Sequence, residues 1–154
     1  MNLTFYKYQG TGNDFVFVDN RAKTFPKNNV EIISKLCDRN FGVGADGIIL
    51  IEEDLNTDFK MVYFNADGSE TFCGNGARCA VAFAKKLDII EKQTTFLAVD
   101  GNHFAKIKDD IVSLQMIDVS EIQLNENSVF MHTGTQHHVE IVDDLEKYPV
   151  FWYS

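Results

Sequence analysis

Residues 71–80 read T-F-C-G-N-G-A-R-C-A, which places the thiol of Cys73 directly before a glycine-rich turn and an alanine-rich segment. If a helix begins near Gly74 to Gly76, its first backbone N–H groups have no partner within the helix, and glycines leave them uncovered. A helix N-terminus favours a nearby carboxylate or thiolate and lowers the pKa of a cysteine. Cys73 is therefore a candidate base beside an anion cradle, and the alternative is a structural cysteine packed in a turn.

Two asparagines lie in or beside turns, Asn13 in G-T-G-N-D-F and Asn65 in N-A-D-G-S-E. Asparagine tolerates left-handed backbone and caps turns, so each position taken alone has a structural explanation. An amide side chain also donates and accepts hydrogen bonds, which suits the carboxylate or ammonium group of an amino acid.

The segment H-T-G-T-Q-H-H-V-E begins at His132 and offers three histidines and Glu140. On a strand His138 and Glu140 share a face, whereas His137 points to the other. The spacing matches no known metal motif, so one functional histidine is favoured over a metal site. The residues alone do not choose which histidine. His103 is expected to be structural.

The remaining glycines and cysteines favour structural roles. F-G-V-G-A-D-G contains G-x-G-x-x-G ending at Gly47, but an expected helix precedes it and a strand follows, which reverses the dinucleotide-binding order. Cys37 and Cys79 fall within expected helices and are read as core thiols. Three cysteines cannot all pair, which indicates reduced thiols in the cytoplasm.

The elements that must position these groups follow from periodicity. A helix is expected over 31–39, capped by Asn28 with Glu31 in a capping box, and a second over 76–87, whose apolar character on nearly all sides is typical of a buried helix. Strands are expected over 3–9, 14–19, 47–53, 58–65, 94–99, 102–108, 111–117, 128–133 and 138–142. Hairpin-length connections dominate, so the predicted fold is α+β, a mostly antiparallel rolled sheet around a central buried helix.

Length and charge narrow the function classes. A chain of 154 residues is long enough for one domain with a hydrophobic core. A net charge of −9 argues against nucleic acid and against anionic membrane surfaces as partners, although local amides can still bind an anion. No apolar run approaches the ~20 residues of a membrane span, and the N-terminus lacks the features of a signal peptide.

Taken together, G-T-G-N-D-F, G-V-G-A-D-G, N-A-D-G-S-E, C-G-N-G-A-R-C and G-T-Q-H-H-V-E resemble the N-terminal half of the diaminopimelate epimerase family in order and spacing. The resemblance implies a cytoplasmic, cofactor-independent epimerase that interconverts LL- and meso-diaminopimelate in lysine and peptidoglycan-precursor synthesis. It also implies one of two similar halves, so residues 1–154 are expected to be an N-terminal domain. The C-terminal partner domain, with a second catalytic cysteine, is expected to be missing, and the family is often dimeric.

The resemblance assigns roles to individual residues. Cys73 matches a catalytic cysteine and His137 a supporting histidine. The substrate-binding matches are Asn13, Asn65, Gly74 and Asn75. The chain departs from the family pattern at Gly47, where glutamine is common, and at Thr135-Gln136, where Asn-Pro is usual, so Gly47 and Thr135 are possible substrate contacts. No metal or other cofactor is expected.

Two other functions remain open at this stage. One is another isomerase of the same fold that works without pyridoxal phosphate, such as a relative of proline racemase or a phenazine-biosynthesis-like isomerase. The latter typically lacks a cysteine at this position, so Cys73 disfavours it. The other is a non-catalytic module that binds an amino acid at the same helix terminus.

Overall fold

The computed structural model describes residues 3–133 and 136–148. The chain divides into two compact units, Met1–Ile117 and Asp118–Ser154, which are called the N-terminal unit and the C-terminal unit below. In the described part of the chain, no helix has the length and apolar character that crossing a membrane requires.

The N-terminal unit is built on a seven-stranded sheet whose strand order follows the chain order. The strands are β1 (Tyr6–Gly10), β2 (Asn13–Asp19), β3 (Gly47–Glu52), β4 (Phe59–Asn65), β5 (Gln93–Ala98), β6 (Gly101–Lys108) and β7 (Ile111–Leu114). The pairs β2–β3 and β4–β5 are parallel, and the other four are antiparallel. The prediction of a mostly antiparallel sheet is confirmed.

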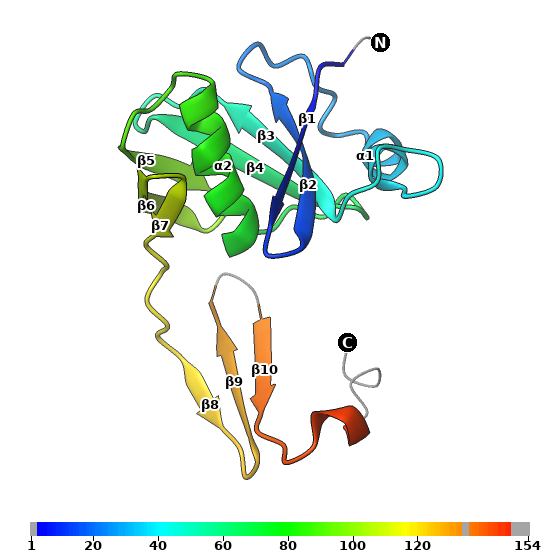
Figure 1. Cartoon of the computed structure of the whole chain (residues 1–154), viewed down its shortest axis with the longest axis vertical. Coiled ribbons are helices and arrows are strands. Elements are labelled where there is room, and N and C mark those ends of the chain that lie inside the picture. Colours follow the sequence, from blue (N-terminus) through cyan, green and yellow to red (C-terminus); the bar gives the residue numbers. More distant parts are fainter. Residues whose placement is uncertain (1–2, 134–135, 149–154) are drawn as a thin grey trace. The chain divides into compact units, whose positions relative to one another are not determined.

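Two helices pack on opposite faces of the central strands. Helix α2 (Gly74–Lys86) lies against the concave face of the curled sheet, and α1 (Val30–Cys37) lies outside it (Figure 1). Alternate strand residues face the two helices: Phe15 and Phe17 of β2 belong to the cluster around α2, whereas Val16 and Val18 belong to the cluster around α1. This period of two explains why β3 is buried along its whole length. The predicted central buried helix is confirmed.

The start of α1 differs from the prediction by one residue. Asn29, and not Asn28, is the N-cap, and its side-chain oxygen accepts a hydrogen bond from the backbone N–H of Ile32 at 3.2 Å. Asn28 lies inside a turn closed by the Asn29 N–H and the Pro26 carbonyl at 2.9 Å. The capping box is also wrong, because Glu31 pairs with Lys35 at 2.7 Å instead.

Tight turns join the hairpins of this sheet. Thr11 and Gly12 connect β1 to β2 with φ of 54° and 92°, and Asp109 and Asp110 connect β6 to β7 with φ of 48° and 64°. Positive φ at both central residues is the turn geometry that matches the twist of antiparallel strands. It brings Asn13, the first residue of β2, directly opposite Gly10.

The C-terminal unit contains a separate three-stranded antiparallel sheet in the order β10-β9-β8. Its elements are β8 (Ile122–Leu124), β9 (Ser128–His132), β10 (Gln136–Glu140) and the short 3-10 helix η1 (Leu145–Lys147). Strand β8 and η1 were not predicted, and β10 begins two residues before the predicted 138–142. Among residues 118–133 and 136–148, none is buried.

Candidate functional site

The thiol of Cys73 lies at the N-terminus of the central helix, α2. Cys73 is the N-cap of α2, with extended backbone (φ −136°, ψ 116°), and its Sγ accepts a hydrogen bond from the Gly76 N–H at 3.5 Å. The side chain is half-buried. The expected placement beside a helix N-terminus is confirmed, although α2 begins at Gly74 rather than at Gly76.

The two glycines after Cys73 differ in what they contact. A Cβ at Gly76 would lie 2.8 Å from Cδ1 of Ile49, so this glycine lets the first turn of α2 approach β3. A Cβ at Gly74 would have Met116 as its nearest neighbour, at an ordinary distance of 3.6 Å. Packing therefore favours a glycine at position 76, whereas at position 74 there is room for a side chain.

The N-terminus of α2 lies at the end of the sheet where β2 and β3 begin. The site candidates Asn13, Gly47, Asn65 and Asn75 all lie at this end. Strands β2 and β3 begin here, at Asn13 and Gly47, and β4 ends here, at Asn65, which pairs with Gly47. Helix α2 starts beside the β1–β2 turn (Figure 1), and a Cβ at Gly10 would lie 3.2 Å from the carbonyl oxygen of Asn75. The fold thus brings together asparagines that are far apart in the sequence.

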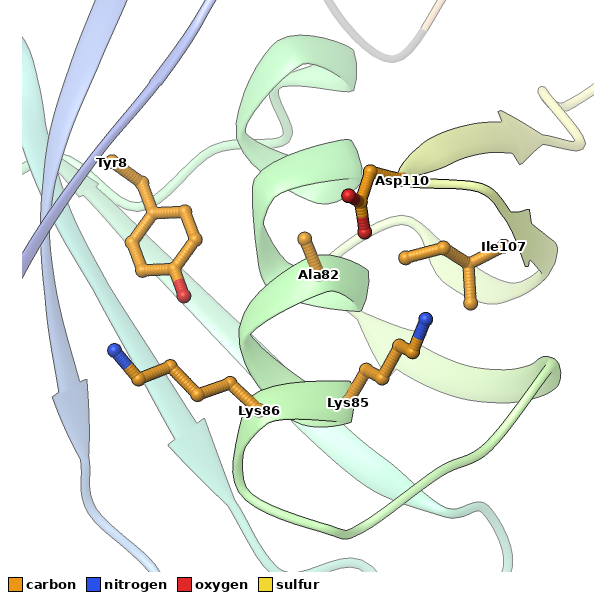
Figure 2. Close-up of a pocket in the computed structure, with 6 residues that line it drawn as sticks. All are labelled: Tyr8, Ala82, Lys85, Lys86, Ile107 and Asp110. Atoms are coloured by element: carbon orange, nitrogen blue, oxygen red, sulfur yellow. The ribbon is translucent and has the colours of Figure 1, made fainter.

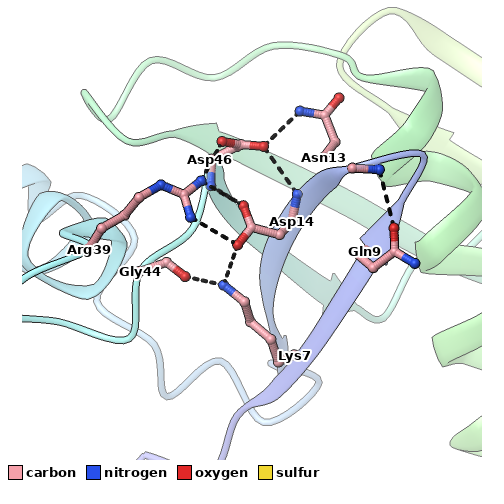
Figure 3. A network of polar contacts seen from close by, with 8 residues as sticks. Lys7, Gln9, Asn13, Asp14, Arg39, Gly44 and Asp46 are labelled. Carbon is pink, nitrogen blue, oxygen red and sulfur yellow. Dashed lines mark hydrogen bonds and ion pairs between the residues drawn. The ribbon is translucent and has the colours of Figure 1, made fainter.

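A chain of hydrogen bonds joins Asn13 to the first turn of α2. Asn13 donates from Nδ2 to Oδ2 of Asp46 at 2.7 Å (Figure 3). Its Oδ1 accepts from Nδ2 of Asn75 at 2.9 Å, and Oδ1 of Asn75 accepts in turn from the guanidinium of Arg78. Asp46 and Arg78 were not singled out in the sequence, although they lie within the G-V-G-A-D-G and C-G-N-G-A-R-C motifs.

Asp46 is itself held by a charged network (Figure 3). Arg39 bridges Asp46 and Asp14, at 2.8 Å to one oxygen of each, and Lys7 contacts Asp14 at 2.8 Å. The hydrogen bond from Arg39, followed by the contact with Lys7, holds the pKa of Asp14 well below its usual value. The backbone N–H of Asp14 also donates to Asp46 at 3.1 Å, which ties β2 to the residue before β3.

Tyr63 contacts both Asn65 and Gly47, and the sequence analysis did not identify it as a site residue. The hydroxyl of Tyr63 donates to Oδ1 of Asn65 at 2.7 Å, and Nδ2 of Asn65 donates to Oγ of Ser69 at 3.0 Å. A Cβ at Gly47 would lie 2.5 Å from the Tyr63 ring and 2.3 Å from the Phe64 carbonyl oxygen. Burial, and after it the charge of Cys73, raise the pKa of Tyr63.

The other two thiols lie in the core, as predicted. Cys37 is 3% exposed and Cys79 is 6% exposed. Burial raises the pKa of Cys37 to about 11 and also raises the pKa of Cys79. Both side chains are therefore packed away from solvent, whereas Cys73 is half-buried.

The histidines divide between the two units. His103 is 2% exposed, stacks on the Phe72 ring at a centroid distance of 4.3 Å and contacts Asp100 at 2.9 Å, so it is a core residue. His137 is exposed on β10 in the C-terminal unit, opposite Met131. Thr135 lies outside the described residues. Among the described residues, no group of three or more His, Cys, Asp or Glu side chains could hold a metal ion.

A groove of about 470 Å³ lies along the C-terminal half of α2, away from this site. Figure 2 shows Lys85 and Lys86 of α2 beside it, with Tyr8 on one side and Asp110 on the other. Of the α2 residues that line the groove, Ala82 is nearest to Cys73 in the sequence, and it lies more than two helical turns beyond Cys73. The groove therefore lies further along α2 than Cys73, and a smaller hollow that shares Tyr8, Ala82 and Asp110 with it reaches Arg78.

Comparison with known proteins places this arrangement in a family. The sequence model for diaminopimelate epimerase matches residues 5–120. A diaminopimelate epimerase of Flavobacterium psychrophilum is 58% identical over 150 residues, covering 96% of this chain and 59% of that protein. One of a Hydrogenobaculum species is 40% identical, covering 91% of this chain and 58% of that protein. The chain thus spans under two thirds of the length of these relatives.

Solved structures with low sequence identity share the fold. A Bacillus anthracis phenazine biosynthesis protein of the PhzF family aligns with a TM-score of 0.72 at 15% identity, covering 95% of this chain and 58% of that one. A probable proline racemase of Agrobacterium radiobacter aligns with a TM-score of 0.64 at 14% identity, covering 90% and 52%. The predicted α+β fold is confirmed, and from the family match and the relatives together, this chain belongs to the diaminopimelate epimerase family.

Proposed function

We propose that this chain supplies the N-terminal half of a diaminopimelate epimerase and that Cys73 is one of its two proton-transfer groups. The observation that carries the proposal is the half-buried thiol at the N-cap of α2, directly before Gly74 and Asn75, the first residues of the helix. The relatives from Flavobacterium and Hydrogenobaculum indicate the substrate, because both are named diaminopimelate epimerase.

Inversion at an α-carbon needs a base on one face and an acid on the other. As a thiolate, Cys73 takes the α-proton and leaves the electron pair of the C–H bond on the carbon, from which the negative charge spreads into the adjacent carboxylate. A thiol on the opposite face then returns a proton with inverted configuration. Backbone N–H groups at the start of α2 stabilise the charge as it develops, and one such donor is worth about 3–4 kcal/mol in other enzymes.

The other site residues are proposed in supporting roles. The amides of Gly74 and Asn75 hold the α-carboxylate of the substrate, and Asn13 and Asn65 are substrate-binding side chains. Gly47 has no side chain to contribute, and the Tyr63 ring occupies the space beside it.

The remaining proposals concern groups outside the described site. We propose a catalytic role for His137 and a substrate contact by Thr135, as the family resemblance implies. The second cysteine belongs to a C-terminal domain that lies outside this chain. We further propose a cytoplasmic location, no cofactor and a homodimer.

The test joins this chain to the C-terminal part of the Flavobacterium relative that the 150-residue match does not cover. The chimera is incubated with LL-diaminopimelate in D₂O, and loss of the α-proton signal is followed by NMR. We expect exchange and inversion by the chimera, a loss of about 10²–10⁴-fold in Cys73→Ser, and no exchange by the 154-residue chain alone.

Two controls make this test decisive. Cys37→Ala removes a buried thiol on the other helix, so it is expected to keep the activity of the parent chimera. Proline is supplied in parallel, because the fold is shared with a probable proline racemase. Wild-type turnover in Cys73→Ser would remove the proposed base, and turnover of proline alone would replace the proposed substrate.

A further inference from the structure

His103 is a polar side chain among aromatic rings of the cluster around α2. It belongs to β6, and its side chain is 1% exposed. Its ring stacks on that of Phe72, with centroids 4.3 Å apart and planes 2° from parallel, and also on that of Phe96 at 5.5 Å. An apolar ring would fill this place without the cost of burying polar nitrogens, so the presence of an imidazole calls for a reason.

Both ring nitrogens of His103 are held by hydrogen bonds. Nδ1 lies 3.3 Å from the backbone carbonyl of Gln115, and Nε2 lies 2.9 Å from Oδ1 of Asp100. A carbonyl oxygen only accepts, so Nδ1 carries a hydrogen. The contact with Asp100 then needs a second proton between Nε2 and Oδ1, whichever of the two atoms holds it. The two hydrogen bonds fix the position and the plane of the ring, which stacking alone would leave free to slide.

The stacked ring of Phe72 links His103 to the candidate base. Phe72 directly precedes Cys73 in the chain and is 3% exposed. Cys73 caps α2, and its Sγ accepts a hydrogen bond from the Gly76 N–H at 3.5 Å. A shift of the Phe72 ring passes to the backbone of Cys73, because the two residues share a peptide bond. The position of His103 therefore influences where the thiol lies.

The carbonyl of Gln115 links His103 to the first residue of the same helix. Gln115 directly precedes Met116, which is 40% exposed. The thioether of Met116 lies against Gly74, since a Cβ on this glycine would be 3.6 Å from Cε and 3.7 Å from Sδ. The contacts thus reach the start of α2 from His103 by two routes, one along each segment.

We propose that His103, held by Asp100, is a positioning residue for proton transfer at Cys73. The same contacts place Met116 against the first residue of α2. The inference deepens the proposed function, on which it rests for the reaction. Misplacing a reacting group by about 1 Å can cost about a hundredfold in rate. A buried imidazole that is fixed at both nitrogens supplies this precision from within the core, without touching the substrate.

The first experiment measures this placement by NMR in the 154-residue chain, without any substrate. We expect the parent to show a nuclear Overhauser contact between the methyl group of Met116 and the α-protons of Gly74. His103→Phe keeps a ring that can stack and loses both hydrogen bonds, so this contact should be lost and the amide signal of Gly76 should move. Persistence of the contact in His103→Phe, or its absence from the parent, would overturn the proposal.

Two variants of Asp100 test the hydrogen bond itself and keep the test open if His103→Phe does not fold. Asp100→Ala removes the partner of Nε2 and should lose the contact as His103→Phe does. Asp100→Asn can donate from its amide to Nε2 of a neutral His103, which keeps both hydrogen bonds, so it should restore the contact. Parent-like behaviour of Asp100→Ala, or the same loss in both variants, would contradict positioning through Nε2.

Turnover in the chimera is the second readout. We expect His103→Phe to lower kcat about tenfold and to change KM by less than about twofold, because the thiol is displaced while the substrate contacts remain. The matched control is Asn20→Ala, just beyond β2, which removes another buried polar side chain with two partners, Glu52 and the Phe25 N–H. It should lose stability and keep kcat. An equal loss of kcat in Asn20→Ala would leave His103 a purely structural role. If the NMR contact behaves as expected but the parent chimera does not epimerise, only the proposed function fails.

Discussion

The two units of this chain differ in how far they bury their apolar side chains. In the N-terminal unit, Phe15, Phe17 and Phe83 are completely buried around α2. In the C-terminal unit, Leu124 is 77% exposed and Ile141 is 95% exposed, and no described residue is buried. Both units contain hydrogen-bonded sheets, so strand pairing alone does not produce a core.

The difference lies in what covers each sheet. Helices α1 and α2 cover two faces of the central strands in the first unit. In the second unit, the register places Leu124 and Val139 opposite Val129 on one face, and no helix of the unit buries that face among the described residues. A small sheet needs a packed face for independent stability. The comparison therefore predicts unequal stabilities, which three experiments can test.

The largest expected effect is from a core truncation. Phe83 is fully buried and meets the rings of Tyr6, Tyr8 and Phe17, so Phe83→Ala should lower the free energy of unfolding by about 3–5 kcal/mol. Leu124→Ala should change it by less than about 0.5 kcal/mol, because this side chain is exposed. Urea unfolding followed by circular dichroism measures both. Equal costs would mean that the units share one core.

Hydrogen exchange should show the next largest difference. Amides of β3 and β4 lie in the centre of the seven-stranded sheet, so they should exchange only on global unfolding. Amides of β8, an edge strand of three exposed residues, should exchange at least about a hundredfold faster through local opening. Mass spectrometry of peptic fragments resolves the two regions. Comparable protection of β8 would contradict the predicted difference in stability.

The smallest expected effects are those of removing ion pairs. Asp14→Asn removes a carboxylate that contacts both Arg39 and Lys7 and should cost about 1–2 kcal/mol, whereas Asp144→Asn, at the exposed pair with Lys147, should cost less than about 0.5 kcal/mol. Because the pKa of Asp14 is lowered in the folded state, its contribution is present above pH ~4 and is lost as the pH falls through the folded-state pKa. Urea midpoints at pH 7 and pH 2.5 should therefore differ less for Asp14→Asn than for the parent.

Local sequence signals were sufficient for most elements of the N-terminal unit. The continuous apolar run at β3 and the alanine-rich, mostly apolar segment of α2 are strong composition signals, and the cap position of Cys73 follows from the glycines after it. The one-residue error at Asn28 arose because two adjacent asparagines can both cap a helix, and only the turn closed on Pro26 decides between them. Strand β8 was missed because its three residues are too few to show a period.

The partners of the site residues could not be predicted in this way. Asp46 reaches Asn13 because β2 and β3 pair in parallel with Phe15 opposite Gly47, a register that only the folded sheet sets. Tyr63 alternates as an ordinary strand residue, and its contact with Asn65 depends on the space left at Gly47. Motif spacing identified the asparagines, but their orientation required the contacts.

The strand order of the N-terminal unit has a consequence for how the protein is made. Each of β2 to β7 is hydrogen-bonded to the strand synthesised just before it, so the sheet can grow strand by strand at one edge as the ribosome releases the chain. Helix α2 emerges after four strands and before the last three. Strands β1 to β4 can pack on α2 as soon as it forms, but its contact with β7 must wait for translation to pass that strand, and until then part of this apolar helix stays exposed to chaperones.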